Sequence, residues 1–233
     1  MKNFVAVPAT TYIPGFIARG SLISIFGVDF TDTTAIATTV PLPTELGGVT
    51  VTIGGEKAKL LYVSPGQINL QVPDALANME QDTVIFSTRP YPQSIFGKIS
   101  IFDTSPGLFS ANSDGTGAAA ASVIYVTGTT LRYDVAATCL PGQRCTTKPI
   151  DVRAADNVFL ELYGSGIRYY HSLIQAEIAG IEAEVTYGGA HCCFVGVDQV
   201  NVKIPKILVA RGEVDLRLIV DGNPANIIKI FLK

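Results

Sequence analysis

The chain contains one pattern of short apolar segments twice, and this duplication constrains the fold more than any other feature of the sequence. Each copy has an apolar segment that ends in glycine, then a pair of glycines, then a Gln-x-Asn segment that ends in proline. The matching landmarks lie 137, 134 and 132 residues apart, which is the spacing of Gly27 and Gly164, of Gly54 and Gly188, and of Asn69 and Asn201. This near-constant spacing predicts two copies of one folding unit whose loops differ slightly in length.

Strand-like alternation dominates both copies. Apolar and β-branched residues alternate with polar ones over short stretches bounded by Gly, Pro, Asn and Asp. We expect strands near 4–8, 21–27, 49–53, 58–63, 67–72, 82–88 and 95–102, then near 107–111, 118–126, 130–136, 158–163, 181–187, 191–195, 199–204, 213–220 and 226–232. Short helical turns are expected at 74–80 and 206–210. With about seven short strands per unit, the sequence predicts an all-β fold of two tandem immunoglobulin-like β-sandwich domains.

Prolines and glycines after the last strand of the first copy mark the domain boundary. The segment Asp103-Thr-Ser-Pro-Gly107 separates a first domain, residues 1–103, from a second, residues 104–233. The second domain is longer because it contains an inserted loop with two cysteines. In both domains the paired glycines are predicted to supply the positive φ of tight hairpin turns, and these are Gly54, Gly55, Gly188 and Gly189.

Two amide pairs recur in the duplicated strand. Gln67 with Asn69, and Gln199 with Asn201, lie two residues apart, so each pair faces one side of its sheet. We interpret these amides as caps of neighbouring loop backbone that both copies need. A polar row that binds a ligand is the alternative.

Composition and charge exclude several classes of function. Charged residues make up 16% of the chain and the net charge is −3, so no basic surface for nucleic acid or anionic membranes is expected. No run of 18 apolar residues exists, and a membrane-spanning helix is therefore not predicted. Pro8 and Pro14 interrupt the apolar N-terminal stretch, which lacks the pattern of a signal peptide.

The four cysteines bear on the compartment. Cys139 and Cys145 enclose a turn-forming Leu-Pro-Gly-Gln-Arg loop, and a local disulfide is predicted there, with two unpaired thiols as the alternative. Disulfides persist in oxidising compartments, so an extracellular or cell-surface protein is expected. Cys192 and Cys193 are interpreted as small buried apolar side chains. A bond between them, or a bridge to a partner chain, is the less favoured alternative.

The landmarks in combination resemble a known family. They are a strand ending in Phe-Gly or Tyr-Gly, a Thr-Ile-Gly-Gly segment, and the run Leu61-Tyr-Val-Ser-Pro-Gly-Gln-Ile-Asn-Leu-Gln-Val-Pro73, with a related Asp198–Pro205 segment in the second copy. The chain is similar to the Solibacter-type C-terminal repeat domain of exported acidobacterial proteins, which is in turn similar to immunoglobulin-like IPT/TIG modules. The resemblance covers nearly the whole chain and implies an exported, non-catalytic module. It carries over no catalytic residue.

Three local clusters are candidate sites. Arg168, Tyr169, Tyr170 and His171 are predicted in a loop at one end of the second sandwich, where aromatic side chains could stack on a sugar or contact a protein. The alternative is that a tyrosine covers the core. The run 191–193 has His-Cys-Cys chemistry, but a zinc site needs about four ligands, so no metal is predicted. The run 112–117 offers oxygen ligands and glycines, yet it lacks the bidentate glutamate of a calcium loop and is interpreted as a turn.

No catalytic constellation is apparent. The chain has two histidines and no nucleophile elbow, P-loop or dinucleotide fingerprint. We therefore expect no enzyme and no cofactor. The function expected is an exported structural or adhesive module, self-assembling through the edge strands near its termini, around Phe4–Val7 and Ile227–Lys233. An extracellular carbohydrate-binding module is the alternative, and a DNA-binding module of the Rel type is disfavoured by the negative charge.

Overall fold

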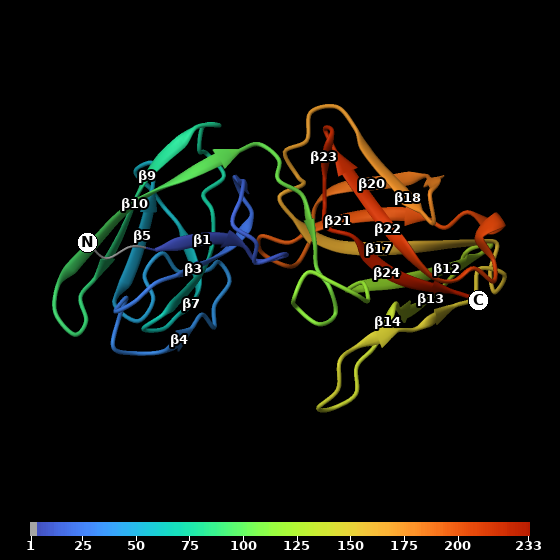
Figure 1. Cartoon of the computed structure of the whole chain (residues 1–233), viewed down its shortest axis with the longest axis horizontal. Coiled ribbons are helices and arrows are strands. Elements are labelled where there is room, and N and C mark those ends of the chain that lie inside the picture. The colour runs from blue at the N-terminus through green and yellow to red at the C-terminus, as the bar shows by residue number, and fades with distance from the viewer. Residues whose placement is uncertain (1–3) are drawn as a thin grey trace.

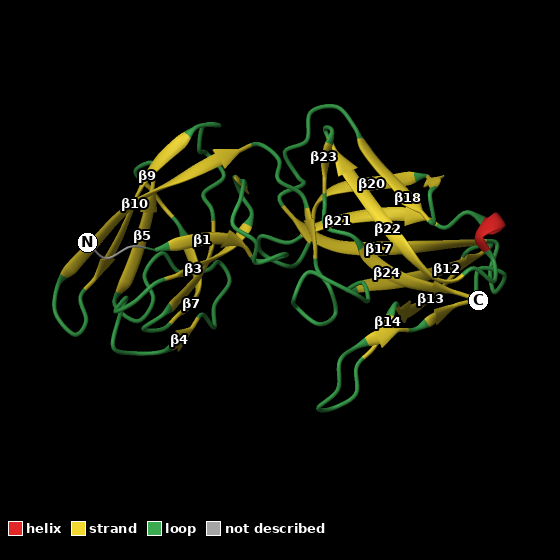
Figure 2. Cartoon of the chain, in the orientation of Figure 1, coloured by secondary structure: helices red, strands yellow, loops and turns green. Residues whose placement is uncertain are grey.

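The computed structural model describes residues 4–233, and residues 1–3, where the first predicted domain begins, lie outside the described part. Two β-sandwiches lie side by side along the long axis of the molecule (Figure 1). Strands and loops make up nearly all of the chain (Figure 2), and the helical element in the described range is a 3-10 turn, η1 (Lys206–Leu208). No helix of the described residues is long and apolar enough to cross a membrane. The fold is all-β, in agreement with the sequence.

Two five-stranded sheets form the first sandwich. Its strands are β1 (Val5–Pro8), β2 (Ile17–Ala18), β3 (Leu22–Phe26), β4 (Ala35–Ile36), β5 (Val49–Ile53), β6 (Glu56–Lys57), β7 (Lys59–Val63), β8 (Gln67–Gln71), β9 (Glu80–Ser87) and β10 (Gln93–Phe102). One sheet has the order β1-β3-β8-β7-β4 and the other β2-β10-β9-β5-β6. Alternate side chains of these strands are buried between the sheets, as in β5, because successive residues of a strand point to opposite faces.

The second sandwich repeats this arrangement with additions. Its strands are β11 (Gly107–Leu108), β12 (Ala121–Thr127), β13 (Thr130–Val135), β14 (Ala137–Thr138), β15 (Thr146–Thr147), β16 (Pro149–Ile150), β17 (Asn157–Ser165), β18 (Ile174–Ile178), β19 (Ile181–Ala183), β20 (Val185–Ala190), β21 (Asp198–Lys203), β22 (Gly212–Val220), β23 (Asn223–Pro224) and β24 (Ile228–Leu232). The two main sheets have the orders β13-β12-β17-β21-β20 and β16-β24-β22-β18-β19. The hairpin β14–β15 carries the loop with Cys139 and Cys145.

Each sandwich has its own hydrophobic core. The first core is formed by buried residues between Ile17 and Ile101, and the second by buried residues between Leu108 and Leu232. No residue belongs to both clusters, and the segment between them contains the boundary predicted at 103–107. The division of the cores is what two separately packed domains require.

The pairing of strands confirms the duplication but corrects one part of its register. Gly27 corresponds to Gly164 and Asn69 to Asn201, because Ser24 pairs with Asn69 on β8 as Glu161 pairs with Asn201 on β21. The hairpin β5–β6, however, corresponds to β18–β19. Residues 51–62 therefore match residues 176–187 at a spacing of 125, and the predicted equivalence of Gly54 with Gly188 is wrong.

Gly188 and Gly189 lie inside strand β20 and do not form a hairpin turn. The turn that matches Gly54-Gly55 is Ala179-Gly180, and all four of those residues have positive φ. Gly188 is needed for packing instead, since a Cβ atom there would lie 2.2 Å from Cδ1 of Ile174. A glycine pair can thus serve close packing as readily as a turn.

Other local expectations also differ from the structure. The predicted strand at 191–195 is a loop, no helical turn forms at 74–80, and β18 was missed. The C-terminal strand β24 is not an edge: it lies between β16 and β22, and Lys229 also bonds to the main chain of Gly117 and Ala119. The N-terminal strand β1 does lie at the edge of its sheet.

Candidate functional site

The loop that the sequence nominated, residues 168–171, begins with a buried ion pair. Arg168 Nε donates to Asp198 Oδ1 at 2.6 Å, and the side chain of Asp198 is fully buried. Asp198 Oδ2 also accepts from the main-chain N–H groups of Ile167 and Arg168. Burial raises the pKa of Asp198, while the guanidinium of Arg168 and these N–H groups oppose that rise. The pair fixes the loop at the start of β21, so Arg168 is a structural residue here.

Tyr169 contacts the first sandwich. Its hydroxyl donates to Asp74 Oδ1 at 2.8 Å, and the guanidinium of Arg19 lies 3.8 Å from the centre of its ring. Desolvation raises the pKa of Tyr169, and the hydrogen bond to Asp74 adds to the rise. A cation over an aromatic face and a hydrogen bond to a carboxylate both stabilise this position of the ring. Tyr169 therefore joins the two domains.

Asp103 extends this contact. It accepts a hydrogen bond from Arg19 Nε at 2.8 Å, and its other oxygen lies 3.0 Å from His171 Nε2. The hydrogen bond with His171, together with the interaction with Arg19, lowers the pKa of Asp103 below its ordinary value. Arg19 thus contacts both Asp103 and Tyr169, and the predicted boundary residue belongs to the network between the sandwiches.

Main-chain contacts bring the two domains close together. Leu22 N–H donates to Ser165 Oγ at 2.9 Å, and Ser165 Oγ donates to the carbonyl of Gly196 at 3.0 Å. A Cβ atom on Gly196 would lie 2.4 Å from Leu22, and one on Gly166 would lie 2.2 Å from the carbonyl oxygen of Ser105. Gly196 thus leaves room for the side chain of Leu22, and Gly166 for the main chain at Ser105, and a side chain at either position would prevent this approach.

The predicted ligand loop therefore serves mainly as a domain contact. Of its four residues, Arg168 and Tyr169 are held by partners at the junction and His171 pairs with Asp103. Tyr170 faces a different region, a hollow of 230 Å³ beside Leu173, Ile174, Tyr187 and Gly188. The aromatic residues at 169 and 170 do not form one flat patch.

A cleft of 320 Å³ lies between the sandwiches, with Lys59, Gln71 and Asp74 on one side and Arg168 and residues 191–196 on the other. His191 stacks on Phe194 with ring centres 4.6 Å apart, and Phe194 is 59% exposed. Gln71 is buried, and no described residue hydrogen bonds to its Oε1. Aromatic and polar groups thus meet in one cleft.

The cysteines at this cleft differ from the interpretation as buried thiols. Cys192 and Cys193 are exposed and bonded to each other. The two cysteines do not lie in a strand, because the chain turns at this point. The turn is held by His191 Nδ1, which accepts from the main-chain N–H groups of Cys193 and Phe194. The ligand atoms of residues 191–193 lie within 4.8 Å of one another, but the two sulfurs are joined to each other, which removes the thiolates that a metal would need.

The repeated amides bond to each other. Gln67 Nε2 donates to Asn69 Oδ1 at 2.8 Å, and Gln199 Nε2 donates to Asn201 Oδ1 at 2.9 Å. The expected caps of loop backbone by these side chains are not among the hydrogen bonds of the described residues. Each pair lies along the strand that duplicates, β8 in the first sandwich and β21 in the second, so the same contact recurs in both copies.

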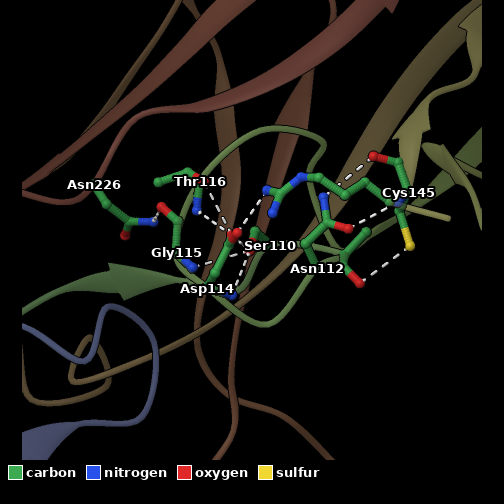
Figure 3. Close-up of polar contacts among 9 residues, drawn as sticks. Ser110, Asn112, Asp114, Gly115, Thr116, Cys145 and Asn226 are labelled. Carbon is green, nitrogen blue, oxygen red and sulfur yellow. Dashed lines mark hydrogen bonds and ion pairs between the residues drawn. The ribbon is translucent and has the colours of Figure 1, made fainter. Parts of the chain in front are cut away.

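The run 112–117 forms a closed network with the disulfide loop (Figure 3). Asp114 accepts from Ser110, from the main chain and hydroxyl of Thr116, and from Arg144 Nη2 at 2.6 Å. The hydrogen bond from Arg144 is the largest cause of its lowered pKa. The amide of Asn112 bonds to both the N–H and the carbonyl of Cys145. Cys139 and Cys145 are bonded at 2.04 Å, the disulfide that the sequence predicted. The carboxylate that a calcium ion would need already has its own donors.

One family model matches part of the chain. The family model described as IPT/TIG domain matches residues 9–116, which cover the first sandwich and the start of the second. No curated protein matches the chain. Among solved structures, bovine butyrophilin covers 99% of this chain and 99% of its own, at 9% identity and a TM-score of 0.27. IPT/TIG and immunoglobulin-like domains are in general non-catalytic structural or adhesive modules.

The residues that sequence reasoning missed are the partners of the loop. All three partners come from the first sandwich. Tyr169 lies 95 residues from Asp74 and 150 residues from Arg19, and His171 lies 68 residues from Asp103. The charge of these residues was the only signal that could have pointed to them, because the chain has few charged residues. Local sequence patterns do not show which residues of the two domains pair.

Proposed function

We propose that the chain is a non-catalytic structural or adhesive module of an exported or cell-surface protein, in which the two sandwiches act as one rigid unit. The network that joins Tyr169, Asp74, Arg19, Asp103 and His171 carries this proposal. Isolated surface ion pairs stabilise little, but several partly buried groups that share partners form a contact with fixed geometry. A module built in this way keeps its length and direction under load.

Two further observations support the proposal. The start of β1 lies in the first sandwich and the end of β24 lies at the far end of the second (Figure 1), so the two sandwiches hold these points apart. The disulfide between Cys139 and Cys145 suits an oxidising compartment.

Rigidity is tested by small-angle X-ray scattering. Wild-type protein should fit one arrangement of the two domains, whereas Tyr169→Ala and Arg19→Ala should broaden the distribution of overall dimensions. Tyr91→Ala, at an exposed position of the first sandwich, is the matched control and should behave as wild type. A wild-type distribution as broad as that of Tyr169→Ala contradicts the rigid unit.

Export is tested separately. Antibodies against the purified protein should label intact cells of the source organism or their surroundings. Confinement of the antigen to the cytoplasm contradicts the proposed location while leaving the scattering result unaffected.

Carbohydrate binding is a second candidate, favoured by the exposed Phe194 in a cleft that Lys59 and Asp74 also line. Sugars stack on aromatic rings and hydrogen bond to polar side chains. A glycan array should then show binding that Phe194→Ala abolishes, while Phe96→Ala, on an exposed sheet face elsewhere, retains it. An array without bound glycan, or equal binding by the Phe194→Ala variant, excludes this site.

A further inference from the structure

Strand β13 is an open edge that the first sandwich does not have. In the first sandwich β1 ends the sheet beside β3, whereas in the second a hairpin adds β13 outside β12. Within the described residues β13 pairs with β12 alone. It is six residues long, contains no proline and has no register shift, so Arg132 and Asp134 are the features of this strand that could protect a sheet edge.

The outward face of β13 is apolar. Leu131, Tyr133 and Val135 alternate along it and are 52%, 64% and 53% exposed. Tyr133 lies opposite Ile124, which lies opposite Phe159, so an apolar row crosses three strands on the solvent side of the sheet. Such a row at an open edge is typical of a surface that another strand covers.

The main chain of β13 also has free bonding groups. Gly128 and Thr129 form a two-residue loop, which makes Thr127 and Thr130 a hydrogen-bonded pair. Bonds to β12 then fall on Thr130 and every second residue after it. The main-chain groups of Leu131 and Tyr133 therefore point to the open edge.

We propose that β13 pairs with β13 of a second copy of this chain, antiparallel and with a two-fold axis at Tyr133. This register places Leu131 opposite Val135 and Arg132 opposite Asp134 of the other copy. In this register residues 131, 133 and 135 form the hydrogen-bonded pairs, and these are the residues whose main-chain N–H and C=O groups point to the open edge. Apolar side chains meet on one face and opposite charges meet on the other, so the strand is complementary to itself.

Neighbouring registers lack this match. A shift of one residue places Leu131 opposite Asp134 or Arg132 opposite Val135, which sets a charge against an apolar group. A shift of two residues places Arg132 opposite Arg132 or Asp134 opposite Asp134, which sets like charges against each other. The other long edges are less suited, since β1 ends in Pro8 and β20 contains a register shift between Val185 and Tyr187. The dimer extends beyond the proposed structural role and does not depend on rigidity between the domains.

Charge reversal tests the register. Arg132→Asp places aspartate opposite Asp134, and Asp134→Arg places arginine opposite Arg132, twice in each dimer. Sedimentation velocity of the full chain should show a concentration-dependent dimer for wild type, with the dissociation constant raised about tenfold in each variant. Equimolar mixing of the two variants should restore dimers, because every pair across the axis is then opposite in charge.

The mixture also separates assembly from folding. Arg132 stacks on Tyr125 and Asp134 bonds to Lys148, so either variant loses local contacts, but two misfolded chains would not recover by mixing. Arg153→Asp, at an exposed site outside β13, makes the same change in net charge as Arg132→Asp and should leave the dimer unchanged. A wild type that stays monomeric at every concentration, or a mixture no more dimeric than its components, overturns the proposal.

Discussion

The hydroxyl of Tyr169 in the second sandwich donates a hydrogen bond of 2.8 Å to Oδ1 of Asp74 in the first. This bond joins two domains whose hydrophobic cores share no residue. The domains are therefore coupled through polar side chains and close main-chain contacts, and the coupling can be changed without touching either core.

Tyr169→Phe should weaken this coupling. The ring can remain under Arg19, but Asp74 loses its donor, which costs about 1 kcal/mol for a partly buried bond. Urea unfolding should show the loss as a lower midpoint with little change in slope. Tyr170→Phe removes the neighbouring hydroxyl, for which the described residues supply no partner, and should leave the midpoint unchanged. Equal effects of both variants would show that the bond to Asp74 contributes nothing.

Removal of the buried carboxylate should be more severe. Asp198→Ala leaves the guanidinium of Arg168 and the N–H of Ile167 without their acceptor, and we expect the second sandwich to lose about 3–5 kcal/mol. Asp198→Asn keeps an acceptor oxygen and should lose less, about 1–3 kcal/mol. Thermal unfolding of both variants checks the order, and an alanine variant as stable as the asparagine variant contradicts it.

The sequence allowed prediction of the duplication, the all-β class and most strands, because alternation and turn residues act locally. It did not allow the register of the middle hairpin to be predicted. Thr-Tyr-Gly-Gly189 looks like Thr-Ile-Gly-Gly55, yet the glycine pair at 188–189 lies in a strand and the pair at 54–55 lies in a turn. Letters alone do not distinguish a glycine required by positive φ from one required by a neighbouring side chain.

The candidate loop was located from the sequence but its role was not. Exposed aromatics at the end of a sandwich are typical of binding loops. Here Asp74, Arg19 and Asp103 of the first domain contact the loop instead, which makes it a contact between domains. Those contacts depend on how the two domains are placed, which local patterns do not specify. The segment 191–195 was predicted to be a strand, but the chain turns back there, with His191 N–H bonded to the carbonyl of Val197 and Val197 N–H to that of Phe194.

The free energy of unfolding at low pH should depend on the ionisation of Asp221. Partial burial raises its pKa, but the N–H groups of His171, Ser172 and Leu173 outweigh that effect and bring the pKa to about 2. Because this lies below the ordinary value of 3.8, the carboxylate adds to stability above pH 4 and the contribution is lost as pH falls through about 2. The stability difference between wild type and Asp221→Asn should shrink over that range.

The measurement is chemical unfolding at steps between pH 5 and pH 2. Asp156→Asn is the control, since Asp156 accepts one N–H, that of Gly128, and lies at a surface turn. A difference between wild type and Asp221→Asn that is constant with pH contradicts the linkage.

The corrected duplication predicts opposite effects at two matching turn positions. Gly54 and Ala179 both have positive φ, 58° and 53°, but a left-handed conformation costs a residue with a Cβ atom about 1 kcal/mol relative to glycine. Ala179→Gly should therefore raise the free energy of unfolding by about that amount, and Gly54→Ala should lower it. The lowering includes displacement of Gln81, whose Oε1 would lie 2.4 Å from the new Cβ atom.

Gly180→Ala isolates the backbone effect. Gly180 has φ of 74°, and no atom lies within 4 Å of a Cβ placed on it, so its loss reports strain without a clash. Urea unfolding of the three variants gives the comparison. A destabilised Ala179→Gly variant would contradict the argument that the left-handed conformation at this position costs alanine more than glycine.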